Sequence, residues 1–250
     1  MRIRHHASLG LAATACLVLS GCTNAADWNA NRSSQIHSFD TSSIQAQPDI
    51  IAKLPQGALE DGVLDVAAST DYAPAEFLDP SGTAVGYDVD LTNAIAAVLG
   101  VKGKVHTAEF DSIIASIGSK YDAGISSFTV TPERTAEVDM TAYINVGSRF
   151  NVQAGNPKGV ETSDHLKLCG RTIGVQVGTA QETTMRDAAD KCAQAGKPVL
   201  SVRSYSKQSE ATTGLVGGTI DATYSDSTVA GYAVELTDGQ IVTLGEIEDA

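Results

Sequence analysis

The chain has 250 residues, a formal net charge of −13 and an isoelectric point near 4.6. This acidity argues against nucleic acid as a partner, because phosphate groups bind to basic surfaces. The length is sufficient for two modest hydrophobic cores.

The first residues predict export. A basic start, MRIRHH, precedes an apolar run, ASLGLAATACLVLSG, that is too short to predict a membrane span. The run ends in LSGC, Leu19–Cys22, which resembles a bacterial lipobox, where the cysteine is acylated and begins the mature chain. We expect residues 1–21 to be a lipoprotein signal peptide and Cys22 to anchor the chain at the outer face of the cell membrane. The alternative, an ordinary signal peptide, leads to the same compartment without an anchor, in the periplasm for example.

Residues 22–58 are polar, weakly periodic and rich in Ser, Asn and Ala. Such a composition predicts a flexible tether between the lipid and the folded body. The folded part is expected to start near Leu59.

The next segments alternate between short apolar runs and helical patterns. A strand is expected within 62–69, a helix over 88–100 that ends at Gly100, a second helix over 110–118 and a strand within 121–128. The apolar face of the first helix is expected to consist of Leu91, Ile95, Val98 and Leu99. Strand–helix–strand repeats predict a parallel sheet.

The stretch SSFTVTPER, Ser126–Arg134, predicts the end of a strand followed by the start of a helix. Thr131 suits the cap and Pro132 suits the first helical position. Arg134 has the wrong sign for the positive end of the helix dipole. Two interpretations remain open: an arginine that binds an anion, or a solvated arginine paired with a glutamate of the same segment.

The pattern restarts in the second half of the chain. Strands are expected within 171–178, 201–205 and 219–226, and helices over 179–196, from about 206, and into 229–235. Two α/β units in tandem are the simplest account, with lobe 1 over 59–147 and lobe 2 over 148–250. Ligands of such sheets lie at the carboxyl ends of the strands.

The cysteines predict one disulfide. Cys16 leaves with the signal peptide and Cys22 is assigned to the lipid, so that Cys169 and Cys192 remain. A pair of cysteines outside the cytosol is usually oxidised. No His/Cys cluster in the sequence has the spacing of zinc ligands, so no metal is expected.

Four stretches of the sequence resemble a known family. They are VAASTDYAPAEFLDPSGTAVGYDVDL, FDSIIASIGSKYDAGISSFTVTPERTAEVDMT, GVQVGT and GTIDATYSDS, in this order. The chain from about Leu59 onward is similar to the polar amino-acid-binding proteins of ABC importers, the bacterial extracellular solute-binding proteins of family 3. The resemblance implies the type II periplasmic binding protein-like fold, in which two α/β lobes with parallel-rich sheets close on a ligand. It also implies a monomer that has no cofactor and no catalytic residues, and that delivers its ligand to an ABC permease.

The resemblance also implies the ligand contacts. Arg134 matches the arginine that grips the α-carboxylate of the ligand, a task that suits a bidentate guanidinium group. Asp226 matches the acid that receives the α-ammonium, although the residue alone favours a helix cap. Tyr72 and Phe110 match the aromatic residues that cover the two faces of the ligand. The other implied contacts are Ser126, Ser127, Thr129, Gln176, Gly178 and Thr179.

The segment GVQVGTAQE predicts the end of a strand and the start of a helix. Thr179 and Glu182 are spaced as a capping box. Free backbone amides at this helix start, at Gly178 and Thr179, are also expected to meet the carboxylate, because helix N-termini bind anions.

The chain departs from the family pattern on the side of the ligand's side chain. Ser69 stands where the family often has an acid, Gln176 where it has a basic residue, and Ala75 where it has an aromatic residue. This neutral lining argues against strongly basic ligands, and Arg149 is within reach of an acidic one. A polar or acidic amino acid is therefore expected.

The end of the sequence is a second departure. The family normally returns to lobe 1 through a second hinge strand, whereas this sequence stops at LGEIEDA. The return to lobe 1 is therefore expected to be missing, so that either the sequence is incomplete or lobe 1 is completed in another way.

Other functions of the same fold remain open. They are a periplasmic dehydratase acting on prephenate-like substrates, and a ligand-sensing or partner-binding lipoprotein. No Gly-x-Ser-x-Gly elbow, paired catalytic carboxylates or HExxH motif in the sequence supports hydrolysis.

Overall fold

The computed structural model of the chain describes residues 38–249. No helix within that range is both long and apolar enough to cross a membrane. The predicted signal peptide, Cys22 and the first part of the predicted tether lie outside the described residues.

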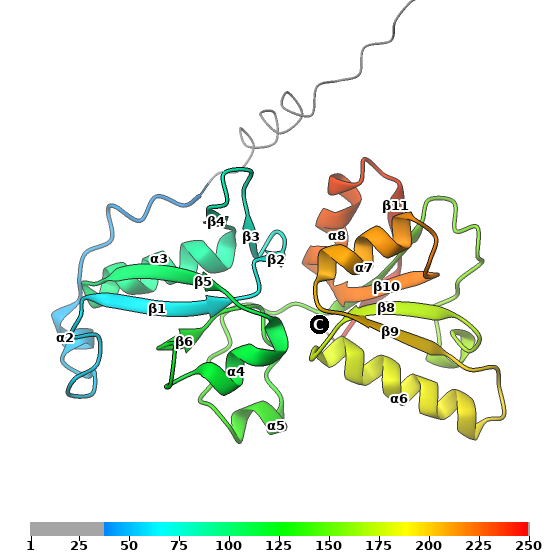
Figure 1. The fold of residues 1–250 in the computed structure, drawn as a ribbon, viewed down its shortest axis with the longest axis horizontal. Helices are drawn as coiled ribbons and strands as arrows, with labels where there is room; N and C mark the ends of the chain where they lie inside the picture. Colours follow the sequence, from blue (N-terminus) through cyan, green and yellow to red (C-terminus); the bar gives the residue numbers. More distant parts are fainter. Residues whose placement is uncertain (1–37, 250) are drawn as a thin grey trace, which may run out of the picture. The chain divides into compact units, whose positions relative to one another are not determined.

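Two groups of elements follow one another along the chain, and we call them lobe 1 and lobe 2 (Figure 1). The elements of lobe 1 are α2 (Pro48–Ile51), β1 (Val63–Ala68), β2 (Asp71–Tyr72), β3 (Glu76–Leu78), β4 (Ala84–Val85), α3 (Tyr87–Leu99), β5 (Lys102–Thr107), the 3-10 helix η1 (Phe110–Ser112), α4 (Ile113–Ser116), β6 (Ala123–Gly124) and α5 (Pro132–Thr135). The elements of lobe 2 are β7 (Ser148–Gln153), the 3-10 helix η2 (His165–Lys167), β8 (Thr172–Gln176), α6 (Ala180–Gln194), β9 (Ser201–Tyr205), α7 (Gln208–Val216), β10 (Ala222–Asp226), α8 (Ser227–Leu236) and β11 (Ile241–Glu248).

Lobe 1 is built on the parallel sheet β5-β1-β6. The side chains of β1 alternate between the two faces of this sheet. Leu64 and Val66 pack with Ala96 of α3, whereas Ala67 packs with Ile113 of α4. The predicted strand–helix–strand order of this lobe is confirmed.

The apolar face predicted for α3 is wrong. The buried residues of α3 are Asp88, Val89, Thr92 and Ala96, whereas Ile95 is 37% exposed. A Cβ atom added to Gly103 of β5 would lie 3.3 Å from the Cβ of Ala96. The helix therefore approaches the sheet through small side chains, which turns its larger aliphatic side chains away. The predicted end of the helix is confirmed, because Gly100 adopts the left-handed conformation.

Part of the segment predicted as a tether packs against lobe 1. Within 22–58, the backbone N–H of Gln47 donates to the Val98 carbonyl at 2.8 Å, and the N–H of Phe39 donates to Asp90 Oδ2 at 2.9 Å. These bonds hold the α2 region on α3. The structure thus differs from the expectation over the described part of this segment, because backbone hydrogen bonds fix it despite its polar composition.

Lobe 2 is built on a five-stranded sheet of order β11-β7-β10-β8-β9. Strand β8 is parallel to β9 and β10, as predicted, whereas β7 is antiparallel to β10 and β11. Helix α6 covers one face of this sheet and α7 and α8 cover the other (Figure 1). The β2-β3-β4 sheet of lobe 1 and strands β5, β7 and β11 were not predicted.

The core of lobe 2 contains the predicted disulfide. Cys169 and Cys192 are bonded, with their Cα atoms 5.7 Å apart, and Cys192 is fully buried. Phe150 and Tyr224 stack in the same core with ring centroids 4.2 Å apart. The disulfide prediction is confirmed.

Candidate functional site

The structure brings most of the predicted contact residues around one cavity. All of them line it except Gln176 and Gly178: Tyr72, Phe110, Ser126, Ser127, Thr129, Arg134, Thr179 and Asp226, joined by Ala180 and Gln181. Its volume is about 10 Å³, hardly room for one water molecule. A ligand larger than a water molecule therefore requires the two lobes to move apart.

The position of the cavity follows from strand direction. Asp226 is the last residue of β10, and Thr179 lies three residues beyond the end of β8. In lobe 1, Ser126, Ser127 and Thr129 follow the end of β6. Carboxyl ends of neighbouring parallel strands share one edge of a sheet, where ligands of α/β folds bind.

Arg134 lies at the start of the short helix α5, which the Thr131 side chain caps as predicted by accepting from the Arg134 N–H. Its Nη1 donates to the Thr129 carbonyl at 2.8 Å and its Nη2 to the Gly178 carbonyl of lobe 2 at 2.9 Å. No carboxylate within residues 38–249 forms a salt bridge with it, which disfavours the pairing with a neighbouring glutamate.

Aromatic rings hold the guanidinium group in place. Its carbon lies 5.5 Å from the ring centroid of Phe110 and 5.2 Å from that of Phe128, and the two rings stack on each other. Burial lowers the pKa of Arg134, opposed by the charges of Asp226 and Glu133. Phe128 was not predicted as a site residue, although it lies between the predicted contacts Ser127 and Thr129 in the sequence.

Asp226 occupies the cap position of α8 but does not cap it. Its Oδ1 accepts from Gln181 Nε2 at 2.8 Å, and its backbone N–H donates to the Tyr72 hydroxyl of lobe 1 at 3.2 Å. Burial raises the pKa of Asp226 to about 6, while the bonds from Gln181 and Tyr72 oppose this rise. The helix-cap interpretation is therefore wrong, and the carboxylate faces the cavity.

Two buried acids of lobe 1, Glu76 and Asp88, bond to the cavity residues Ser126 and Ser127, and sequence reasoning missed them. The Ser126 hydroxyl donates to Glu76 and accepts from the Ser69 N–H, so it is engaged within lobe 1. Burial, reinforced by the nearby Asp88 charge, raises the pKa of Glu76 well above its usual range.

The start of α6 has the predicted capping box. Thr179 Oγ1 accepts from the Glu182 N–H at 3.1 Å, and Glu182 Oε2 accepts from the Gly178 N–H at 2.7 Å. The Gly178 N–H is thus not free for a ligand, contrary to the expectation of free amides at this point. The N–H groups of Ala180 and Gln181 begin the helix and have no intrahelical acceptor.

Gln176 lies beside the cavity rather than in it. Its Nε2 donates to Ser69 Oγ of lobe 1 at 3.0 Å and to the Ser206 carbonyl at 3.2 Å. Its Oε1 is buried and has no partner within the described part of the chain. Ser69 Oγ also donates to Asp71 at 3.0 Å, so a polar cluster joins the two lobes here.

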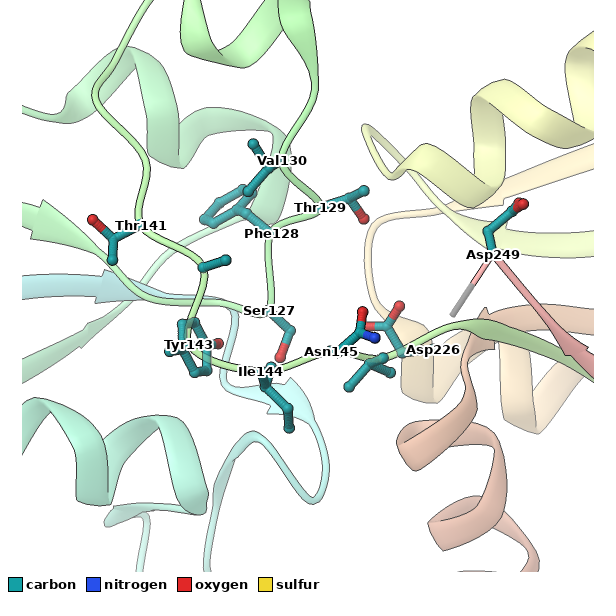
Figure 2. A pocket seen from close by; sticks show the side chains of 12 residues that line it. Ser127, Phe128, Thr129, Val130, Thr141, Tyr143, Ile144, Asn145, Asp226 and Asp249 are labelled. Carbon is teal, nitrogen blue, oxygen red and sulfur yellow. The ribbon is translucent and has the colours of Figure 1, made fainter.

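A second cavity of about 250 Å³ adjoins the first and shares Ser127, Thr129 and Asp226 with it. Figure 2 shows Tyr143 and Ile144 on one side of this cavity and Asp226 on the other. Arg149 is bound elsewhere, because its Nε donates to the Gly245 carbonyl at 3.1 Å. Residues 38–249 contain no group of three His, Cys, Asp or Glu side chains that is suited to a metal ion.

The chain is similar to known amino-acid-binding proteins in both sequence and structure. The profile of the bacterial extracellular solute-binding proteins, family 3, matches residues 64–237. The arginine-binding protein ArgT of Corynebacterium glutamicum is 31% identical over 244 residues, which cover 96% of this chain and 77% of ArgT.

Solved structures give the same result. An ancestral arginine-binding protein bound to arginine has a TM-score of 0.69 and 31% identity, covering 76% of this chain and 81% of that one. The ancestral amino acid-binding protein AncCDT-1, a precursor of cyclohexadienyl dehydratase, has a TM-score of 0.66 and 30% identity, covering 75% of this chain and 78% of that one. The predicted two-lobed α/β fold is thus confirmed.

Proposed function

This chain belongs to the bacterial extracellular solute-binding proteins, family 3, as its motifs indicated, and on that premise we propose that it binds a free polar amino acid between its lobes. It would do so as the substrate-binding component of an ABC importer. Its relative ArgT is named for arginine binding, which supports an amino-acid ligand.

The observation that carries the proposal is the pair formed by Arg134 and Asp226. The guanidinium of Arg134 has no ion-pair partner within residues 38–249, and the carboxylate of Asp226 accepts from the uncharged amide of Gln181. The two groups belong to different lobes and line the same cavity. A free amino acid carries a carboxylate and an ammonium on one carbon, so it complements both groups at once.

The other predicted contacts have supporting roles in this proposal. The ring of Phe110 fixes the guanidinium and offers its remaining surface to the ligand, and Tyr72 covers the opposite face. Thr129 offers its hydroxyl group, whereas Ser127 and Thr179, whose hydroxyl groups already bond within the protein, offer backbone groups. Ser126, Gln176 and Gly178 support the ligand contacts indirectly, because their polar groups already bond to other residues of the protein.

The ligand's side chain would extend toward the cluster of Ser69, Asp71 and Gln176. This cluster presents the Asp71 carboxylate and the unpartnered Oε1 of Gln176, which both accept hydrogen bonds. Burial raises the pKa of Asp71, so a hydrogen-bond donor on the ligand would stabilise its ionised form. We propose a side chain with N–H donors, in place of the acidic side chain that Arg149 suggested.

Closure would link binding to transport. A ligand that bridges both lobes shifts the population toward the closed form by its differential affinity for that form. The permease would then recognise the closed form. Because the family is extracellular, we extend the proposal to a lipid anchor at Cys22 that keeps a monomer near the membrane.

A dehydratase is the second candidate, since AncCDT-1 is described as a precursor of such an enzyme. A sensor or partner-binding lipoprotein is less favoured, because the relatives reported above are named for amino-acid binding. An enzyme would turn over a prephenate-like substrate without added cofactor.

Thermal melting with a panel of free amino acids tests the proposal, because a ligand that binds only the folded state raises the midpoint. The best ligand is then titrated calorimetrically, beside its N-acetylated and C-amidated forms. We expect the free amino acid to bind and both blocked forms to bind at least about tenfold more weakly. Equal affinity for blocked and free ligands would exclude the proposed contacts of Arg134 with the carboxylate and of Asp226 with the ammonium group. Turnover of a prephenate-like substrate without amino-acid binding would favour the dehydratase.

A further inference from the structure

Asp88 joins three segments of lobe 1 beneath the cavity. It is the second residue of α3 and is only 1% exposed. Its Oδ2 accepts from the backbone N–H of Ser127 at 3.0 Å and from the Ser127 hydroxyl at 3.3 Å. Its Oδ1 accepts from the Tyr143 hydroxyl at 2.7 Å. Both oxygens are therefore bonded to residues distant in the sequence.

Ser127 adopts a backbone conformation that needs support. Its φ is 48°, in the left-handed region that non-glycine residues seldom adopt. This residue turns the chain between β6 and α5, and its side chain lines both cavities. The bond from its N–H to Asp88 fixes the turn, and with it the direction of Ser127 and Thr129 toward the ligand.

Tyr143 lies in the segment that connects the lobes. Residues 139–147 have no regular secondary structure and run from the end of lobe 1 to β7 of lobe 2. Tyr143 is 43% exposed, so packing contributes less to its position than it would for a core residue. Its hydrogen bond to Asp88 connects this segment to α3 of lobe 1 (Figure 2 shows Tyr143 and Ser127).

We propose that Asp88 is a positioning residue, which holds Ser127 in its left-handed conformation and couples it through Tyr143 to the segment connecting the lobes. The inference rests on the proposed amino-acid binding. A change in the path of the connecting segment alters the Tyr143–Asp88 bond and is transmitted to Ser127. Ligand contact and lobe movement are thereby linked within lobe 1.

Two variants and one matched control test this inference. Asp88→Asn replaces one of the two acceptor oxygens by an N–H donor, so that Ser127 and Tyr143 can no longer both donate to this side chain, and we expect at least about tenfold weaker ligand binding. Tyr143→Phe removes one hydroxyl, and we expect about threefold weaker binding. Asp90→Asn makes the same charge change in the same helical turn, where Asp90 accepts from the Phe39 N–H, and we expect less than about twofold.

The second measurement is hydrogen exchange of the Ser127 amide, followed by NMR in the ligand-free full chain. We expect faster exchange in Asp88→Asn and also in Tyr143→Phe, because the Tyr143 hydroxyl bonds to Asp88 Oδ1 while the measured Ser127 N–H bonds to Asp88 Oδ2, and no change in Asp90→Asn. Unchanged exchange in Tyr143→Phe, or equal affinities of Asp88→Asn and Asp90→Asn, would overturn the inference while amino-acid binding stands. A wild-type protein that binds no amino acid would refute the proposed function, and the exchange data would still decide the role of Asp88.

Discussion

The two lobes supply the cavity in different ways. Lobe 2 has a five-stranded sheet, a disulfide and a buried cluster around Phe150 and Tyr224, and its cavity residues lie at the end of β10 and the start of the long helix α6. Within residues 38–249, lobe 1 has a three-stranded parallel sheet and smaller buried clusters, and its cavity residues lie in loops and very short elements.

The difference indicates a division of labour. Regions with few buried contacts open locally at lower cost than core strands and helices. We therefore expect lobe 2 to act as the rigid half of the site, and lobe 1 as the half whose loops are fixed by individual hydrogen bonds. The following predictions test this comparison.

A cavity in the core of lobe 2 should have the largest effect. Phe150 is fully buried, so Phe150→Ala is expected to lower the free energy of unfolding by about 3–5 kcal/mol. The matched change in lobe 1, Ile113→Ala, is expected to cost about 2–5 kcal/mol and to affect exchange mainly in lobe 1. Urea unfolding measures both effects, and hydrogen exchange locates them. Equal loss of protection in both lobes for each variant would contradict the division.

Removal of the disulfide should weaken lobe 2 next. The bond closes a loop with a sequence separation of 23, and such a loop stabilises by about 3 kcal/mol in the chain-entropy model. Cys169→Ser combined with Cys192→Ala should lower the unfolding free energy by roughly this amount. Amino-acid affinity should stay near that of the wild type, because neither cysteine lines the cavity. A tenfold loss of affinity would show that lobe 2 is not the rigid half.

Changes to the charged pair Arg134 and Asp226 should affect ligand binding rather than the stability of the fold. Arg134→Met and Asp226→Asn should each weaken binding of the best amino acid by at least about tenfold, or 1.4 kcal/mol. Each change also leaves the opposite charge of the ligand without a partner. Calorimetric titration measures the affinity, and thermal melting of the free variants serves as the control. Wild-type affinity in both variants would contradict a role of Arg134 and Asp226 in ligand binding and would leave Arg134 with a structural role only.

The pH dependence of ligand affinity should follow the ionisation of Asp226. Its pKa is raised to about 6, and only its ionised form receives an ammonium group. Most of the carboxylate is ionised at pH 7, whereas about a tenth is ionised at pH 5, so affinity should fall about tenfold over this range. Asp226→Asn should bind weakly but with little dependence on pH. A flat profile for the wild-type protein would contradict the raised pKa.

Local patterns in the sequence were sufficient for much of the fold. The strand–helix order, the Gly100 helix end, the Thr179–Glu182 box and the disulfide depend on residue type and short spacing, and the structure has all four. The buried face of α3 was mispredicted, because hydrophobicity favoured Leu91 and Ile95, whereas close packing on Gly103 selected small side chains.

The site was predictable only in part, for a similar reason. Arg134 was notable because its charge is unfavourable at a helix start, and the structure places it in the cavity. Gln181 and Glu76 gave no such signal, because their roles depend on partners 45 and 50 residues away. Asp226 was locally ambiguous, since a cap and a ligand contact require the same residue type.

The bond from Arg134 Nη2 to the Gly178 carbonyl has a kinetic consequence. It crosses between the lobes at the group proposed to receive the ligand's carboxylate, so separation of the lobes must break it before that donor becomes accessible. Association would then include a unimolecular opening step, and the observed rate should level off at high ligand concentration instead of rising linearly. Dissociation would pass through the same step, so the residence time of the ligand would be set by the opening of the lobes.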